Sequence, residues 1–115
     1  MLFLNKDREF VRNENVKGGE GYALYKTILP AEFMGDKGRL FSLCRLEKNC
    51  EVGYHIHEGD TEVYYILKGE GEYNDNGVMR TLYPGDVSFT DDGEGHGIKN
   101  VSDEPLIFVA LILYT

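Results

Sequence analysis

The sequence predicts an all-β domain, built as a sandwich or barrel. It contains fourteen glycines and eight tyrosines among 115 residues. Short runs rich in β-branched and aromatic residues alternate with turn residues, which is the pattern of many short strands in succession. A chain of this length is one ordinary domain that can bury a core without disulfide help. We expect one domain over 1–115, with its core over about 38–115 and an N-terminal strand segment over 1–37.

Turn residues divide the chain into its expected strands. Asn76-Gly77 is a hairpin signal, and Pro84-Gly85 predicts the central pair of a type II turn. Gly93-Glu94-Gly95 predicts a tight reversal, and Pro30–Met34 is the one plausible helical piece, a single turn at most. The expected strands are Tyr22–Leu29, Leu40–Leu46, Gly53–His57, Glu62–Lys68, Gly71–Asn74, Val78–Thr81, Asp86–Thr90, His96–Asn100 and Leu106–Tyr114.

The last expected strand is apolar on both faces. Leu106, Phe108, Ala110 and Ile112 share one face, and Ile107, Val109, Leu111 and Leu113 share the other. A strand with this pattern is covered on both sides. One face would line the core. For the other face the pattern leaves two coverings open, namely a second copy of the chain in a homodimer or the N-terminal segment of the same chain.

The composition limits the possible binding partners and the cellular location of the protein. Twelve basic and twenty acidic residues give a net charge of −8, which argues against nucleic acid or an anionic membrane as a partner, because both require clustered Lys and Arg. No apolar run reaches the ~20 residues that cross a bilayer. The start, MLFLNKDREF, lacks the apolar core of a signal peptide. We therefore expect a cytoplasmic protein.

Cys44 and Cys50 are the two cysteines of the chain. Two thiols are no disulfide scaffold, and a cysteine-poor composition suits a reducing compartment. No CxxC spacing is present, so we expect a small buried Cys44 and a loop Cys50 rather than two metal ligands.

The three histidines of the chain are the candidate site. They lie in GYHIHEGDTEVYYILKG (53–69) and in the later segment GEGHGIKN (93–100). His55 and His57 are two apart, so an extended strand places both rings on one face. Glu62 opens the next strand. Imidazole and carboxylate together favour Mn, Fe, Co, Ni, Cu or Zn over Mg or Ca.

Strand parity sorts the neighbouring carboxylates. Glu58 follows His57 directly and points to the opposite face if the strand continues that far. Asp60 falls in the turn. Antiparallel pairing of the strands around the turn 58–61 would bring Glu62 towards His57. His96 would arrive from a different hairpin, with Ile98 alongside it.

The spacing of these residues resembles the two cupin motifs. HxH, four residues, Glu62, six residues and Gly69 resemble the first motif. GDVSFTDDGEGHGIKN (85–100) resembles the second, although Asn49 and Asp91 stand where a glycine and a proline are usual. Both replacements are turn formers. The resemblance implies a double-stranded β-helix, a jelly-roll barrel, that binds one divalent transition-metal ion per chain through His55, His57, Glu62 and His96.

The charge of such a site indicates its ligand. A divalent ion with three neutral imidazoles and one carboxylate carries +1, which attracts a small oxygen-rich anion such as a dicarboxylate, hydroxy acid or enolate. Tyr64 shares the Glu62 face and would donate a hydrogen bond to this ligand; the alternative is plain barrel packing. A second anion contact is left open among five basic residues: Arg39, Arg45, Lys68, Arg80 and Lys99.

The resemblance leaves the activity open. As an enzyme the chain would be a metal-dependent decarboxylase, isomerase or dioxygenase, with no residue that declares itself as the general base. The alternatives are a non-catalytic ligand-binding or sensor module and a sugar-phosphate isomerase-like cupin. A free-standing domain favours the enzyme over the sensor.

Overall fold

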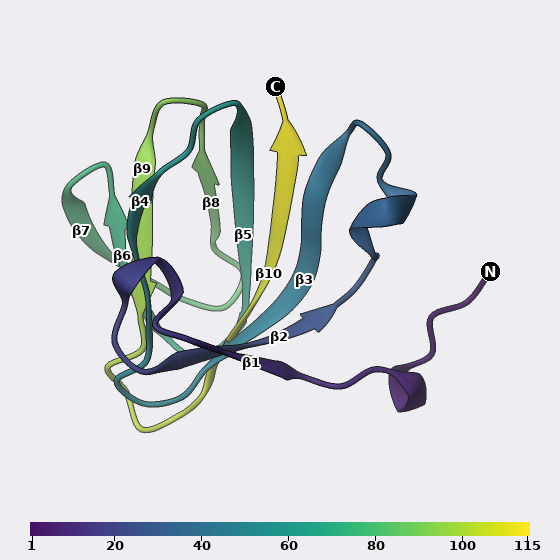
Figure 1. Cartoon of the computed structure of the whole chain (residues 1–115). Helices are drawn as coiled ribbons and strands as arrows, with labels where there is room; N and C mark the ends of the chain where they lie inside the picture. The colour runs from purple at the N-terminus through teal and green to yellow at the C-terminus, as the bar shows by residue number, and fades with distance from the viewer.

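The structure is a computed structural model that describes residues 1–115, and it consists almost wholly of antiparallel strands in two facing sheets (Figure 1). The all-β prediction is confirmed. Three single-turn 3₁₀ helices, Asn5–Asp7, Val16–Gly18 and Ala31–Phe33, are the helical elements, and none has the length or apolarity needed to span a bilayer. The strands are β1 (Val11–Glu14), β2 (Tyr22–Thr27), β3 (Gly38–Leu46), β4 (Glu51–Ile56), β5 (Asp60–Lys68), β6 (Gly71–Asp75), β7 (Val78–Leu82), β8 (Val87–Thr90), β9 (Gly95–Lys99) and β10 (Leu106–Tyr114).

The two sheets differ in size. The larger has six strands in the order β1-β2-β3-β10-β5-β8, and the smaller has four in the order β4-β9-β6-β7. All expected strands are present, with ends that shift by a few residues. Strand β1 was not expected, because its residues are polar except for Val11 and all are exposed at the sheet edge. The hairpin signal is confirmed by the left-handed backbone of Asn76 (φ 51°) and Gly77 (φ 92°), as a type I′ turn requires.

The core lies between the sheets. Leu106, Phe108 and Ala110 of β10 are at most 1% exposed, and Ile66 of β5 and Ile98 of β9 pack into the same cluster. Each of the larger side chains, Leu106, Phe108, Ile66 and Ile98, contributes roughly 1.5–3 kcal/mol by its burial. Cys44 belongs to this cluster and so does Cys50, whose burial just before β4 was not expected; both thiols are free.

The outer face of β10 is not covered by the N-terminal strands. Strands β1 and β2 continue the six-stranded sheet beyond β3 instead of lying over it. On that face Ile107, Val109 and Leu111 are only partly buried, and Leu113 is exposed. Of the two coverings that the sequence left open, the N-terminal strand segment is therefore not the one observed, since that segment pairs at the sheet edge.

Strands β4 and β5 do not pair. The antiparallel pairing expected around the turn 58–61 is wrong, because the chain crosses from the small sheet to the large one at this turn. β4 pairs with β9, and β5 pairs with β10 and β8. Gly59, with a φ of 79°, allows the sharp change of direction. Parity predicts which face a residue occupies, but it does not say which strand lies beside it.

Candidate metal centre

The four predicted ligands come together between the two sheets. His55 and His96 are opposite one another in the β4–β9 ladder, and His57 follows directly after β4. Glu62 reaches them from β5 in the other sheet. One ligand atom from each residue lies within 4.8 Å of those of the other three. His96 is thus the cross-strand partner of His55, rather than an arrival from a separate hairpin.

Three of the four donor groups are in direct contact. His57 Nε2 lies 3.0 Å from Glu62 Oε1 and 3.1 Å from His96 Nε2, and His96 Nε2 lies 2.9 Å from the same carboxylate oxygen. All three side chains are buried, whereas His55 is partly exposed. The cluster is therefore closed on the core side and open on the side of His55.

Each histidine ring is held by its Nδ1 atom. A ring fixed in this way turns its Nε2 towards the common centre, which is the usual arrangement of metal-ligating histidines. The partners are Gly53 O for His55 (2.7 Å), Asp60 Oδ1 for His57 (2.6 Å) and the Tyr73 hydroxyl for His96 (2.9 Å).

The Tyr73 hydroxyl can serve both of its neighbours. It lies 2.9 Å from His96 Nδ1 and 3.2 Å from Thr90 Oγ1. If it donates to Thr90, it accepts the Nδ1–H of His96, and the His96 Nε2 lone pair is left free for an ion. Tyr73 was not singled out in the sequence, because its strand had no visible connection to the histidines.

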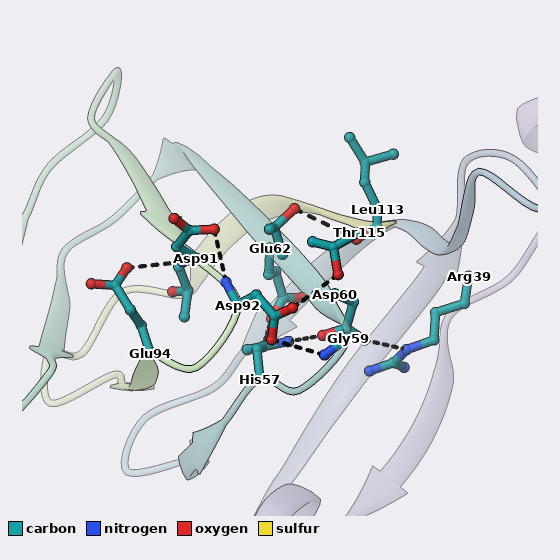
Figure 2. A network of polar contacts seen from close by, with 12 residues as sticks. Arg39, His57, Gly59, Asp60, Glu62, Asp91, Asp92, Glu94, Leu113 and Thr115 are labelled. Carbon is teal, nitrogen blue, oxygen red and sulfur yellow. Dashed lines mark hydrogen bonds and ion pairs between the residues drawn. The ribbon is translucent and has the colours of Figure 1, made fainter.

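Asp60 links the histidine cluster to the guanidinium of Arg39. Its Oδ1 contacts His57, and its Oδ2 accepts a hydrogen bond of 3.0 Å from Arg39 Nε. Figure 2 shows His57 and Arg39 joined through this carboxylate. The sequence reading placed Asp60 in the turn without a role; it is the first residue of β5 and is buried. Its position three residues after His57 could have predicted that it contacts this histidine.

The turn that carries Asp60 is fixed by the loop before β9 and by the C-terminus (Figure 2). Gly59 N donates to Asp92 Oδ1 (2.9 Å), and Thr115 Oγ1 donates to Asp92 Oδ2 (2.9 Å). Asp91, which replaces the usual proline of the motif, donates its backbone N–H to Glu94 (2.9 Å). The loop thus keeps its turn without the proline.

The site balances buried negative charge with imidazole. Burial pushes the pKa of Glu62 upward, but hydrogen bonds from His57 and His96 outweigh it and hold that pKa below its ordinary value. The pKa of Asp60 is lowered in the same way by His57 and Arg39 against burial. The hydrogen bond to Glu62 raises the pKa of His57, whereas burial lowers that of His55. An ionised carboxylate in this setting favours a cation beside it.

A cavity of about 750 Å³ opens from the cluster towards the N-terminal strands. Among the five basic candidates, Arg39 alone lines it; Arg45 is paired with Glu47 and Lys99 with Glu20. The sequence reading missed the contribution of β1 and β2 because β1 was not expected. These strands and the turn between them add Val11, Asn13, Glu14, Asn15, Val16, Lys17, Tyr25 and Thr27 to the cavity wall.

Tyr64 packs beside the cluster, and its hydrogen bond to a ligand stays a prediction. Its ring stacks on His96 at 4.8 Å and packs against Phe108, and the residue is 2% exposed, so it is a packing residue. It also lines the cavity, and its hydroxyl makes no hydrogen bond within the protein. Glu58, as expected, is exposed and lies outside the cluster.

Comparison with known proteins identifies the family. A family model described as a cupin domain matches residues 42–112. An oxalate-binding protein from Thermotoga maritima is 44% identical over 102 residues, which cover 89% of this chain and 84% of that protein. The crystal structure of a predicted oxalate decarboxylase from the same organism is 40% identical over the whole of both chains, with a TM-score of 0.94.

A more distant structure shows the fold alone. It is a protein with a double-stranded β-helix domain from Klebsiella pneumoniae, 24% identical, with a TM-score of 0.73 over 98% of this chain and 84% of that one. The double-stranded β-helix expected from the two motifs is confirmed. With more than half of its residues matched by the family model and two relatives of at least 40% identity, the chain belongs to the cupin family.

Proposed function

We propose that the protein binds one divalent transition-metal ion through His55, His57, Glu62 and His96, and that this ion holds a small oxygen-rich anion of the oxalate or hydroxy-acid class. One observation carries the proposal. All three imidazoles are fixed at Nδ1 by the protein, and one ligand atom from each lies within 4.8 Å of a Glu62 carboxylate oxygen at the end of a cavity.

The residues fit such an ion. Three imidazoles and one carboxylate are donors for Mn, Fe, Co, Ni, Cu or Zn, and Glu62 is held ionised by its two histidine partners. The bound ion would supply a Lewis acid that polarises ligand oxygens. The partly exposed side of His55 faces the cavity, so the cluster has an approach for the ligand.

The relatives support the ligand class. The descriptions of the two Thermotoga maritima matches both name oxalate, one as the ligand of a binding protein and one as the substrate of a predicted decarboxylase. Their descriptions divide along the same line as our two candidate functions, binding and catalysis. The cavity wall also carries the Tyr64 hydroxyl, and we keep a metal-dependent decarboxylase, isomerase or dioxygenase as the second candidate.

The test is calorimetry with oxalate on metal-loaded and metal-free protein, after elemental analysis of untagged protein. We expect about one ion per chain and oxalate binding by the loaded form alone. Equal affinity in both forms would contradict the proposal. Formate production from oxalate by the loaded protein would decide for the enzyme, and tight binding without products would decide for the binding module.

His57→Ala and His96→Ala should each abolish tight metal binding, because each removes a buried donor from the centre of the cluster. Glu58→Ala is the matched control: this carboxylate is adjacent to His57 but exposed and outside the cluster. Metal titration of these three variants and of Glu62→Ala measures the contrast. A Glu58 variant that loses the ion while Glu62→Ala retains it would reverse the ligand assignment.

A further inference from the structure

Arg39 enters the cavity because of an irregularity in β3. Strict alternation would place it on the outer face, with Phe41, Leu43 and Arg45. In the ladder with β10, however, Leu40 is opposite Ile112 and Gly38 is opposite Leu113, so that Arg39 is an extra residue without a partner. A bulge of this kind re-aims a side chain. Arg39 consequently lines the same cavity wall as His55 and His57.

Only one edge of the Arg39 guanidinium is hydrogen-bonded within the protein. Its Nε donates to Asp60 Oδ2 at 3.0 Å, and its terminal amino groups make no hydrogen bond within the protein. The side chain is 44% exposed, against 8% for that of Asp60. Because Asp60 is anchored on its other side by His57, it fixes the Arg39 head in place. The free edge of a guanidinium in this state is a fork that matches a carboxylate.

The other charged residues of the cavity wall do not pair with the free amino groups of Arg39, so these groups can bind a ligand. Glu14, the one carboxylate there outside the cluster, is paired with Arg12. Lys17 adds a second positive charge to the wall. The cavity of about 750 Å³ also exceeds what oxalate fills, since a water molecule occupies roughly 30 Å³ and oxalate has only six heavy atoms.

We propose that Arg39 binds the second anionic group of the ligand and thereby makes the site select dianions over monoanions with the same metal-chelating end. The inference rests on the proposed function, because the chelating end is held by the ion. Beyond the proposed function, it says what binds the end of the ligand that the metal cluster does not reach. It also names Arg39 as the residue that sets specificity.

The experiment compares matched pairs of acids on the metal-loaded protein. Glycolate and tartronate, and likewise lactate and malate, share an α-hydroxy carboxylate and differ by one further carboxylate. Wild-type protein should bind the dianion of at least one pair roughly tenfold more tightly than the monoanion, the strength of a charged hydrogen-bonded pair. Arg39→Gln should abolish that preference, leave the monoanion within about threefold and keep one ion per chain. Arg39→Lys should be intermediate, because it keeps the charge and loses the fork.

Arg45→Gln is the matched control. Arg45 is on the same strand and is paired with Glu47, and it does not line the cavity, so its loss should leave the preference intact. Equal weakening of both members of a pair by Arg39→Gln would overturn the inference and show a general effect of charge. Loss of the ion from Arg39→Gln would also overturn it, since Arg39 would then act through Asp60 on His57. Wild-type protein that binds both members equally would refute this inference alone; wild-type protein that binds no acid would refute the proposed function as well.

Discussion

Asp60 is the residue whose role changes most between sequence and structure, because it orients His57 while it anchors Arg39. We expect Asp60→Asn to weaken metal binding by about 10–100-fold, the usual cost of losing a carboxylate behind a ligating histidine. Competition with a chelator of known affinity measures the change. Glu58→Gln, a neighbouring exposed carboxyl, is the control. Unchanged affinity in Asp60→Asn would mean that the ring is held in place by packing alone.

Protonation of His57 should oppose the ion. Its hydrogen bond to Glu62 raises its pKa, so that without metal this ring takes up a proton above the ordinary value of about 6.5. In the metal-free protein a raised folded-state pKa stabilises the fold below the unfolded pKa, and this contribution is lost as pH rises through the raised value. The ion requires the neutral ring, so its stabilisation grows in that same window. The difference in Tm between loaded and metal-free protein should therefore widen as pH rises from about 5 to 8; a constant difference would exclude His57 as a ligand.

At the scale of elements, the sequence predicts the strands through their turns and the ligands through their spacing. Asn76-Gly77 locates a hairpin, and the alternation of Glu62, Tyr64 and Ile66 identifies a buried face, as observed. The two bulges beside the site could not be predicted. One adds a residue to β4 between Val52 and His55, and the other turns Arg39 inward. Each depends on the register with a partner strand far away in the sequence, which local periodicity does not contain.

The turn that contains Lys17 packs closely against Gly53 of β4 and supports the cavity wall. An added methyl group at Gly53 should destabilise this contact. A Cβ at Gly53 would lie 2.2 Å from Lys17 O, a backbone atom that cannot move without shifting the whole turn. We expect Gly53→Ala to reduce the free energy of unfolding by about 3 kcal/mol, the upper range for overpacking. At Gly35, with a φ of 59°, an added Cβ meets no atom within 4 Å. Gly35→Ala should thus cost only about 1–2 kcal/mol for its left-handed backbone. Denaturant unfolding that ranks Gly35→Ala as the more harmful change would contradict this close contact between Gly53 and Lys17.

At the scale of the molecule, the site lies where the two sheets face each other, and the six-stranded sheet turns its other face to solvent. Exposed apolar side chains gather there on β5, β8 and β10. Cross-strand pairing places Tyr65 opposite Val87 and Val63 opposite Phe89. We define the outer apolar face by its exposed members, which are Tyr65, Leu67, Val87, Phe89 and Leu113.

We predict that this outer apolar face joins two copies of the chain in a symmetric dimer. A contiguous apolar patch marks an interaction surface, and a two-fold interface uses the same patch on both partners. Sedimentation at micromolar concentration should show a dimer, and Phe89→Glu should convert it to a monomer, because it puts two like charges into an apolar contact. Met79→Glu, equally exposed on the small sheet, should stay dimeric. Both variants should retain one metal ion per chain, since the ligand cluster lies on the opposite side of the large sheet. A wild-type monomer would mean that the outer apolar face remains in contact with water.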